Sequence, residues 1–208
     1  MKRRLRLAEA LLCVVLDGDP PAGVLEAALR GGVDVVQLRD KELSGEGLVR
    51  AAKPFRRACA EHGALFILND RPDLVDACGA DGVHVGQSDA SVAEARALVG
   101  DDRIVGLSIE TEAQLDAIDG ADYLGVGAVF ATPTKTESVA GGLELVRAAA
   151  RRVQIPWFAI GGIDLSNVAE VAAAGAPGVA VVRAIRDAHD PDAAAQSLRA
   201  ALGVPRPA

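Results

Sequence analysis

Two cationic side chains and one amide occupy alternate positions after a short aliphatic run. In an extended chain, alternation sends Gln37, Arg39 and Lys41 to the same side. The guanidinium offers a planar fork of donors and the ammonium a compact charge, so together they suit a diphosphate or triphosphate. We therefore predict a polyphosphate site here. The alternative for this segment taken alone is a salt-bridged strand end.

Carboxylates follow the next two aliphatic runs. Asn69 and Asp70 come directly after residues 65–68, and Asp89 lies in the loop after residues 82–85. If these runs are adjacent strands, the two carboxylates lie close together. Carboxylates beside a phosphate site repel the phosphate unless a hard cation lies between them, and Mg²⁺ with few protein ligands meets that need. We predict Asp70 and Asp89 as magnesium ligands; the alternatives are a turn residue and a helix cap.

Two later segments are also suited to anions. Hydroxyls and one ammonium occur together in the loop formed by Thr132, Pro133, Thr134 and Lys135, for which a solvated linker is the alternative. A glycine pair follows a later run, and backbone N–H groups at glycines or at a helix start bind phosphate. The residues of this second predicted phosphate site are Gly161, Gly162, Val182 and Arg183.

The elements that must position these residues alternate strictly. Eight short aliphatic runs are each followed by polar or Gly-rich residues and then by an amphipathic or Ala-rich segment, which predicts alternating strands and helices in a parallel sheet. Eight units in about 200 residues predict an α/β fold, a single (β/α)8 TIM barrel, with a doubly wound open sheet as the alternative. The runs are 12–16, 34–38, 65–68, 82–85, 104–107, 123–126, 157–160 and 179–182.

Local signals set several helix boundaries. Apolar residues from Leu48 to Cys59 share one face of a helix that Gly63 would end. Ser91 with Glu94 has the spacing of a capping box and predicts a helix start. Thr111 with Gln114 has the same spacing and predicts another helix start.

Composition limits the class of protein. Of 208 residues, 50% are hydrophobic but only 3% aromatic, which favours an aliphatic core and one domain over residues 1–202, with a short tail at 203–208. The net charge of −7 argues against nucleic acid and anionic membranes as partners. Three separated cysteines have no metal-binding spacing, and the N-terminus has no cleavage pattern, so we expect a cytoplasmic protein.

The chain resembles the thiamine-phosphate synthase family over nearly its whole length. The matching segments are VQLRDK (36–41), LNDR (68–71), ADGVHVGQSD (80–89), GLS (106–108), ADYLGVG (121–127), TPTK (132–135) and AIGGI (159–163). The resemblance implies a transferase that joins hydroxymethylpyrimidine diphosphate to a thiazole phosphate, or to its carboxylated form, giving thiamine phosphate and pyrophosphate. It implies a dissociative, magnesium-assisted reaction in which pyrophosphate leaves before the thiazole nitrogen attacks.

The resemblance also implies individual roles. The pyrimidine diphosphate would be bound by Gln37, Leu38, Arg39, Asp40, Lys41 and Asn69. Ser108 and Lys135 would contact the pyrimidine and the departing pyrophosphate, and with Arg39 and Lys41 they form the predicted catalytic set. The thiazole phosphate would be bound by residues 132–134, by Gly161 or Gly162, and by residues 182–183.

Some positions depart from the family pattern. Arg183 stands where the family usually has Ser, which either adds a charge to the phosphate site or removes a hydroxyl contact. Ile109-Glu110 replaces a common Thr-His, and Ala128 and Ala131 replace prolines. Two rival functions stay open, namely a thiazole tautomerase-like barrel and a non-catalytic phosphoester-binding barrel. A homo-oligomer is also left open.

Overall fold

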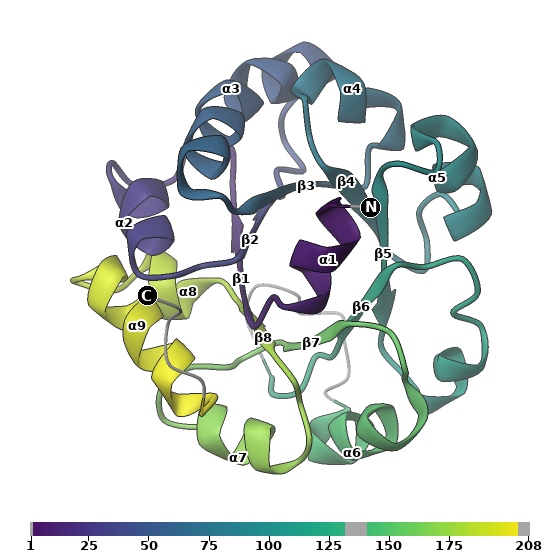
Figure 1. The fold of residues 1–208 in the computed structure, drawn as a ribbon, viewed down its shortest axis with the longest axis vertical. Coiled ribbons are helices and arrows are strands. Elements are labelled where there is room, and N and C mark those ends of the chain that lie inside the picture. The colour runs from purple at the N-terminus through teal and green to yellow at the C-terminus, as the bar shows by residue number, and fades with distance from the viewer. Residues whose placement is uncertain (1, 132–140, 204–208) are drawn as a thin grey trace.

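A computed structural model describes residues 2–131 and 141–203. Within them, eight parallel strands close into a barrel in chain order, each strand pairing with the next and β8 with β1 (Figure 1). This confirms the predicted (β/α)8 barrel and shows that the open-sheet alternative is wrong. The strands are β1 (Leu12–Leu16), β2 (Val35–Leu38), β3 (Leu65–Asn69), β4 (Gly82–Val85), β5 (Ile104–Ile109), β6 (Tyr123–Val126), β7 (Trp157–Ile160) and β8 (Val179–Val181).

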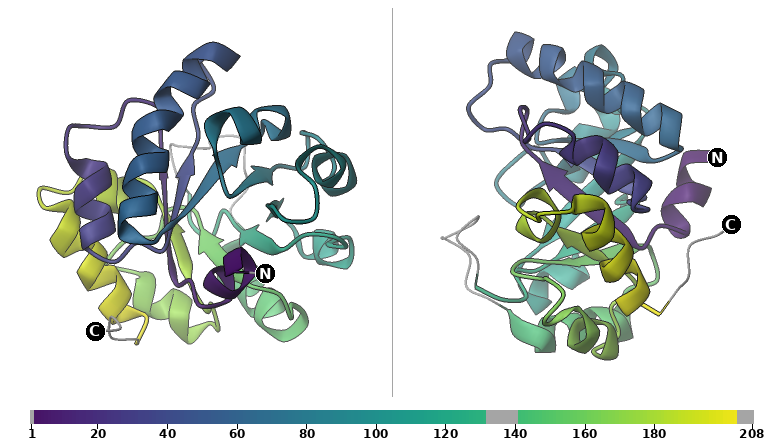
Figure 2. Two further views of the ribbon diagram at one scale, coloured as in Figure 1. Left: turned by 45° about the horizontal axis from the view of Figure 1, so that its top comes forward. Right: turned by 90° about the vertical axis from the view of Figure 1, so that its left-hand side faces the viewer.

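Helices surround the strands, as the views in Figure 2 show. None of those that residues 2–131 and 141–203 form has the length and apolar character of a membrane span. The α-helices are α1 (Lys2–Ala8), α2 (Val24–Arg30), α3 (Gly45–His62), α4 (Val75–Cys78), α5 (Val92–Val99), α6 (Gly142–Arg152), α7 (Val168–Ala173), α8 (Arg183–Arg186) and α9 (Pro191–Ala201). Two 3-10 helices are η1 (Pro72–Leu74) and η2 (Glu112–Asp116).

The helix boundaries follow the local signals with one exception. Gly63 ends α3 in the left-handed conformation with φ 70°, as predicted. The side chains of Ser91 and Glu94 form the predicted capping box of α5. Thr111 also begins a helix, as predicted, with a capping box to Gln114; the exception is the helix type, since η2 is a 3-10 helix. The predicted C-terminal tail lies outside the described residues beyond Gly203.

Side chains alternate between two faces of each strand. Those that point outward pack under the helices and form the larger core, which includes Val36 and Leu38 of β2. Those that point inward fill the lower part of the barrel, as Val35 does. Farther along the strands the inward positions become polar, for example from Val35 to Gln37, so one end of the barrel interior is apolar and the other is polar.

Three even-numbered strands are tied to their predecessors by an aspartate. Asp34, Asp81 and Asp122 each precede a strand, and each carboxylate accepts a hydrogen bond from a backbone N–H of the preceding odd strand. The donors are Leu12 N at 3.0 Å, Phe66 N at 3.0 Å and Val105 N at 2.8 Å, respectively. These contacts stabilise the N-terminal end of the barrel, away from the polar end.

The N-terminal helix closes that same end. Helix α1 lies across the centre of the barrel in Figure 1, and Leu7 is only 1% exposed among the inward-pointing apolar side chains. Arg3 pairs with Asp81 and Arg4 with Asp122, both at 2.7 Å. The sequence alone does not predict this helix, because a seven-residue segment rich in arginine shows little helical periodicity of its own.

Candidate active site

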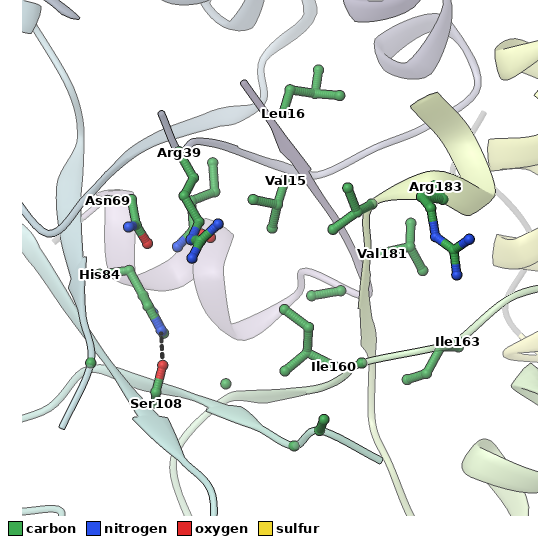
Figure 3. A pocket seen from close by; sticks show the side chains of 18 of the residues that line it. Val15, Leu16, Arg39, Asn69, His84, Ser108, Ile160, Ile163, Val181 and Arg183 are labelled. Atoms are coloured by element: carbon green, nitrogen blue, oxygen red, sulfur yellow. Dashed lines mark hydrogen bonds between the residues drawn. The ribbon is translucent and has the colours of Figure 1, made fainter. Parts of the chain in front are cut away.

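A cavity of about 910 Å³ opens at the C-terminal ends of the strands. Figure 3 shows Arg39, Asn69 and His84 on one side of it and Ile163, Val181 and Arg183 on the other. Loops that follow strands from both halves of the sequence meet here, because parallel strands place all their C-terminal ends at the same rim.

The amide and cations predicted to bind a polyphosphate lie together on this cavity. Gln37, Arg39 and Lys41 all line it, as alternation along β2 and its extension predicts. Gln37 is buried, Arg39 is half-buried and Lys41 is exposed, so the neutral amide lies deepest and the two cations lie nearer to solvent. Asn69 ends β3 and lines the same wall.

Two neighbours in the same segment point elsewhere. Leu38 is fully buried in the core under the helices, where its side chain does not reach the cavity. The carboxylate of Asp40 accepts hydrogen bonds from the backbone N–H groups of Gly18, Glu42 and Leu43 at 3.0, 3.0 and 3.1 Å. These side chains therefore hold the segment in place and do not form the cavity wall.

Asp70 and Asp89 meet at the rim. Burial, and after it the neighbouring Asp89 carboxyl, raises the pKa of Asp70 to about 6, although Arg39 and Lys41 oppose the shift. Asp70 has a φ of 60°, which is uncommon outside glycine and asparagine, and such strain is concentrated at functional sites. Asp89 also accepts a hydrogen bond from the backbone N–H of Gly86 at 2.8 Å, which fixes its side chain.

This pair fits the donor set that Mg²⁺ takes from a protein. Two carboxyl groups that must share a proton would both be ionised beside a divalent cation, and Mg²⁺ commonly uses one or two carboxylates together with phosphate oxygens and water. The part of the chain that the structure describes contains no cluster of three or more metal-ligating side chains. Asp70 and Asp89 would therefore hold a magnesium ion only together with substrate or water ligands.

Ser108 belongs to a buried chain of hydrogen bonds. Its hydroxyl lies 2.9 Å from Nε2 of His84, and Nδ1 of His84 lies 3.0 Å from the hydroxyl of Tyr123 (Figure 3 shows the first contact). The amide of Gln87 donates a hydrogen bond to the backbone carbonyl of Ser108 at 2.6 Å. The sequence alone gives no functional role to His84, Tyr123 or Gln87, because contacts between different strands carry no local signal.

The glycine pair after β7 is required by close packing. Gly161 and Gly162 have φ values of 104° and 65°, which favour glycine. A Cβ atom on Gly161 would lie 2.6 Å from the Cα of Ala128, and one on Gly162 would lie 2.7 Å from the Cβ of Phe130. Both glycines line the cavity.

Two arginines of α8 line the same side. Val182 precedes the helix, and Arg183 is exposed at its first position. Arg186 lies one helical turn later and contacts Asp17 at the end of β1, with Nη1 3.8 Å from the carboxylate. Arg186 is not among the predicted site residues, although its i+3 spacing from Arg183 places both side chains on one face.

The remaining predicted site residues lie outside the described part of the chain. They are Thr132, Pro133, Thr134 and Lys135. Ala128 and Phe130 pack on the glycine pair, and Phe130 N donates to the carbonyl of Gly161 at 3.0 Å.

A (β/α)8 barrel whose strand ends gather cations, paired carboxylates and close-packed glycines around one cavity belongs to the class of enzymes that handle phosphorylated small molecules. The family model described as thiamine monophosphate synthase matches residues 12–185. The chain belongs to this family.

Individual relatives agree with the family match. A thiamine-phosphate synthase of Thermobifida fusca is 47% identical over 208 residues, covering 97% of this chain and 95% of the relative. One of Gloeobacter violaceus is 51% identical over 191 residues, and there the match covers 90% of this chain but only 56% of the relative. A solved thiamine phosphate pyrophosphorylase of Pyrococcus furiosus superposes with a TM-score of 0.86 at 33% identity, covering 96% of this chain and 98% of that one.

Proposed function

We propose that this chain joins a hydroxymethylpyrimidine diphosphate to a thiazole phosphate, or to its carboxylated form, and releases pyrophosphate. The observation that carries the proposal is the Asp70–Asp89 carboxyl pair, which lies where Arg39 and Lys41 act on it electrostatically. Cations and a carboxyl pair at one edge of a cavity are suited to a diphosphate with a divalent cation. The family membership supplies the chemical identity of the two substrates.

The residues of β2 and β3 bind the departing group. Arg39 and Lys41 face the diphosphate and stabilise the negative charge that grows on it as the carbon–oxygen bond breaks. Asn69 offers amide donors on the same wall, and Lys135 adds an ammonium group from its loop. When bound by Asp70 and Asp89, Mg²⁺ supplies further positive charge to the diphosphate.

The pyrimidine ring lies deeper in the cavity. Gln37 and Ser108 point into the barrel interior and contact the ring, and they hold its methylene carbon facing the thiazole. Loss of pyrophosphate leaves a methylene cation, and the thiazole nitrogen attacks that carbon to form the new bond. This reaction needs orientation and charge stabilisation by the protein and does not need a strong base.

The second substrate binds at the opposite wall. Backbone N–H groups near Gly161 and Gly162 and the hydroxyls of Thr132 and Thr134 bind the thiazole phosphate. Arg183 adds a positive charge at the position where the family usually has Ser. Ile160 lies between the two polar walls and Ile163 lies on the wall that carries Arg183, and both apolar side chains pack against the thiazole ring.

A turnover assay tests the proposal against its two rivals. Folded protein is mixed with both substrates and Mg²⁺, and the formation of pyrophosphate and thiamine phosphate is compared with a mixture lacking protein. We expect both products in equal amounts. Release no faster than in the control would contradict the proposal. Conversion of the thiazole carboxylate phosphate without the pyrimidine substrate would instead support the tautomerase-like function.

A further inference from the structure

A line of three polar side chains crosses the interior of the barrel beneath the cavity. Tyr123 and His84 are 3% and 8% exposed, and His84 and Ser108 both line the cavity. They come from β6, β4 and β5, so the chain of contacts joins three neighbouring strands. Of the three residues, only Ser108 is predicted from the sequence to touch a substrate.

The hydroxyl of Tyr123, at the inner end of this line, determines which groups in the line donate hydrogen bonds and which accept them. Burial raises the pKa of Tyr123 well above its ordinary value, so its hydroxyl keeps its proton. In the part of the chain that the structure describes, the hydrogen bond found for that hydroxyl is the one to Nδ1 of His84. Because a buried hydroxyl without an acceptor is costly, the proton of Tyr123 points to Nδ1.

The Tyr123 proton on the side of Nδ1 determines the donors and acceptors in the rest of the line. A neutral imidazole that accepts at Nδ1 carries its hydrogen on Nε2, and Nε2 then donates to Ser108 Oγ at 2.9 Å. Ser108 uses one lone pair to accept this bond and keeps its own O–H for the cavity. The aromatic nitrogens of a pyrimidine are acceptors, so a serine that donates matches them.

The surrounding backbone leaves room for these rings. A Cβ atom on Gly106 would lie 2.6 Å from His84 Nδ1 and would also overlap the ring of Tyr123. One on Gly125 would lie 3.2 Å from His84 Cε1. Phe158 packs edge-on against Tyr123 with ring centroids 5.9 Å apart, which fixes the phenol from the other side. Side chains of ordinary size at positions 106 and 125 would displace the histidine.

We propose that Tyr123 and His84 are positioning residues that hold the imidazole in its Nε2–H form and so make Ser108 a hydrogen-bond donor to the pyrimidine substrate. The substrate part of this inference rests on the proposed function. The tautomer part concerns the protein without substrate.

The tautomer is measured first, by NMR of protein labelled with ¹⁵N at histidine. His84 is distinguished from the exposed His62 and His189 by the signal that disappears in His84→Gln. We expect the protonated nitrogen of His84 to be Nε2 in the wild type, and we expect Tyr123→Phe to reduce that form. Phe158→Leu is the matched control, because it removes packing against the same ring and leaves both hydrogen bonds. It should lower Tm and leave Nε2 protonated.

Kinetics then test the role of the line. Tyr123→Phe should weaken kcat/KM for the pyrimidine diphosphate about tenfold, the value of one hydrogen bond, with KM for the thiazole phosphate unchanged. In a Ser108→Ala background the same substitution should add almost nothing, because the group it positions is gone.

Two results would overturn the inference. One is a wild-type His84 protonated on Nδ1. The other is a Tyr123→Phe penalty of the same size with and without Ser108. Absence of turnover in every variant and in the wild type, with Nε2 protonated, would contradict the proposed function and leave the tautomer assignment standing.

Discussion

The Asp89 carboxyl acts on the Asp70 carboxyl at the rim of the barrel and raises its pKa, although the two residues follow different strands. Each also has a fixed place, since Asp70 N donates to the carbonyl of His84 at 2.8 Å and Asp89 accepts from Gly86 N. The protein thus holds two acidic groups close together, and several consequences can be measured.

Replacing Asp70 with Asn should stabilise the protein in the absence of metal. Because the folded pKa of about 6 lies above the ordinary value of 3.8, the stability linked to this group is present below roughly pH 4 and is lost as pH rises through 6. Asn also tolerates the positive φ. We expect a gain of about 1 kcal/mol near neutral pH, after allowance for solvent screening, and none in acid. Urea unfolding at both pH values measures it.

Magnesium should offset the loss of stability that ionised Asp70 causes near neutral pH. We expect Mg²⁺ to raise the Tm of the wild type more at about pH 8 than at about pH 5, because protons compete for the carboxyl pair. Asp70→Asn and Asp89→Asn should both lose most of this increase. An increase that is the same in all three proteins would show that the ion binds elsewhere.

Arg39→Gln should weaken the diphosphate site. We expect kcat/KM for the pyrimidine diphosphate to fall by about 10-fold to 100-fold, since hydrogen bonds to charged groups contribute about 1.5–3 kcal/mol. Arg50→Gln is the matched control, because Arg50 is an exposed arginine of α3 whose carboxylate partner Glu46 lies at 3.9 Å. Equal losses in both variants would refute the assignment of Arg39.

Arg183→Ser should restore the usual family residue and weaken binding of the thiazole phosphate. Arg183 is exposed and lines the wall opposite Arg39 (Figure 3), so its charge acts on that substrate through solvent. We expect KM for the thiazole phosphate to rise about fivefold, the effect of roughly 1 kcal/mol. Arg183→Lys should keep most of the affinity. An unchanged or lower KM in Arg183→Ser would show that the arginine is neutral or hinders binding.

Leu7→Ala should destabilise the barrel without changing either KM. Leu7 is buried at the end remote from the cavity, and its truncation should cost about 3 kcal/mol. Leu5→Ala provides the control, because Leu5 is 60% exposed on the same helix and its loss should leave the unfolding midpoint unchanged. Chemical denaturation of the three proteins tests this. Similar midpoints for Leu7→Ala and the wild type would mean that α1 does not contribute to the core.

The sequence by itself determined the alternation of strands and helices and the positions at which polar residues follow each strand. Strand periodicity and helix capping are local properties. The sequence alone therefore predicts where residues such as Gln37, Arg39 and Ser91 lie in their strands and helices. Adjacent parallel strands have their C-terminal ends at the same rim, so the sequence also predicts that Asp70 and Asp89 are neighbours.

Only the tertiary structure decided which side chains meet inside and below that rim. The burial of α1, the outward direction of Asp40 and the line from Tyr123 through His84 to Ser108 depend on contacts between segments far apart in the sequence. Such contacts follow from strand register and side-chain packing. No local pattern carries that information, because each of these residues is compatible with several environments until its neighbours are fixed.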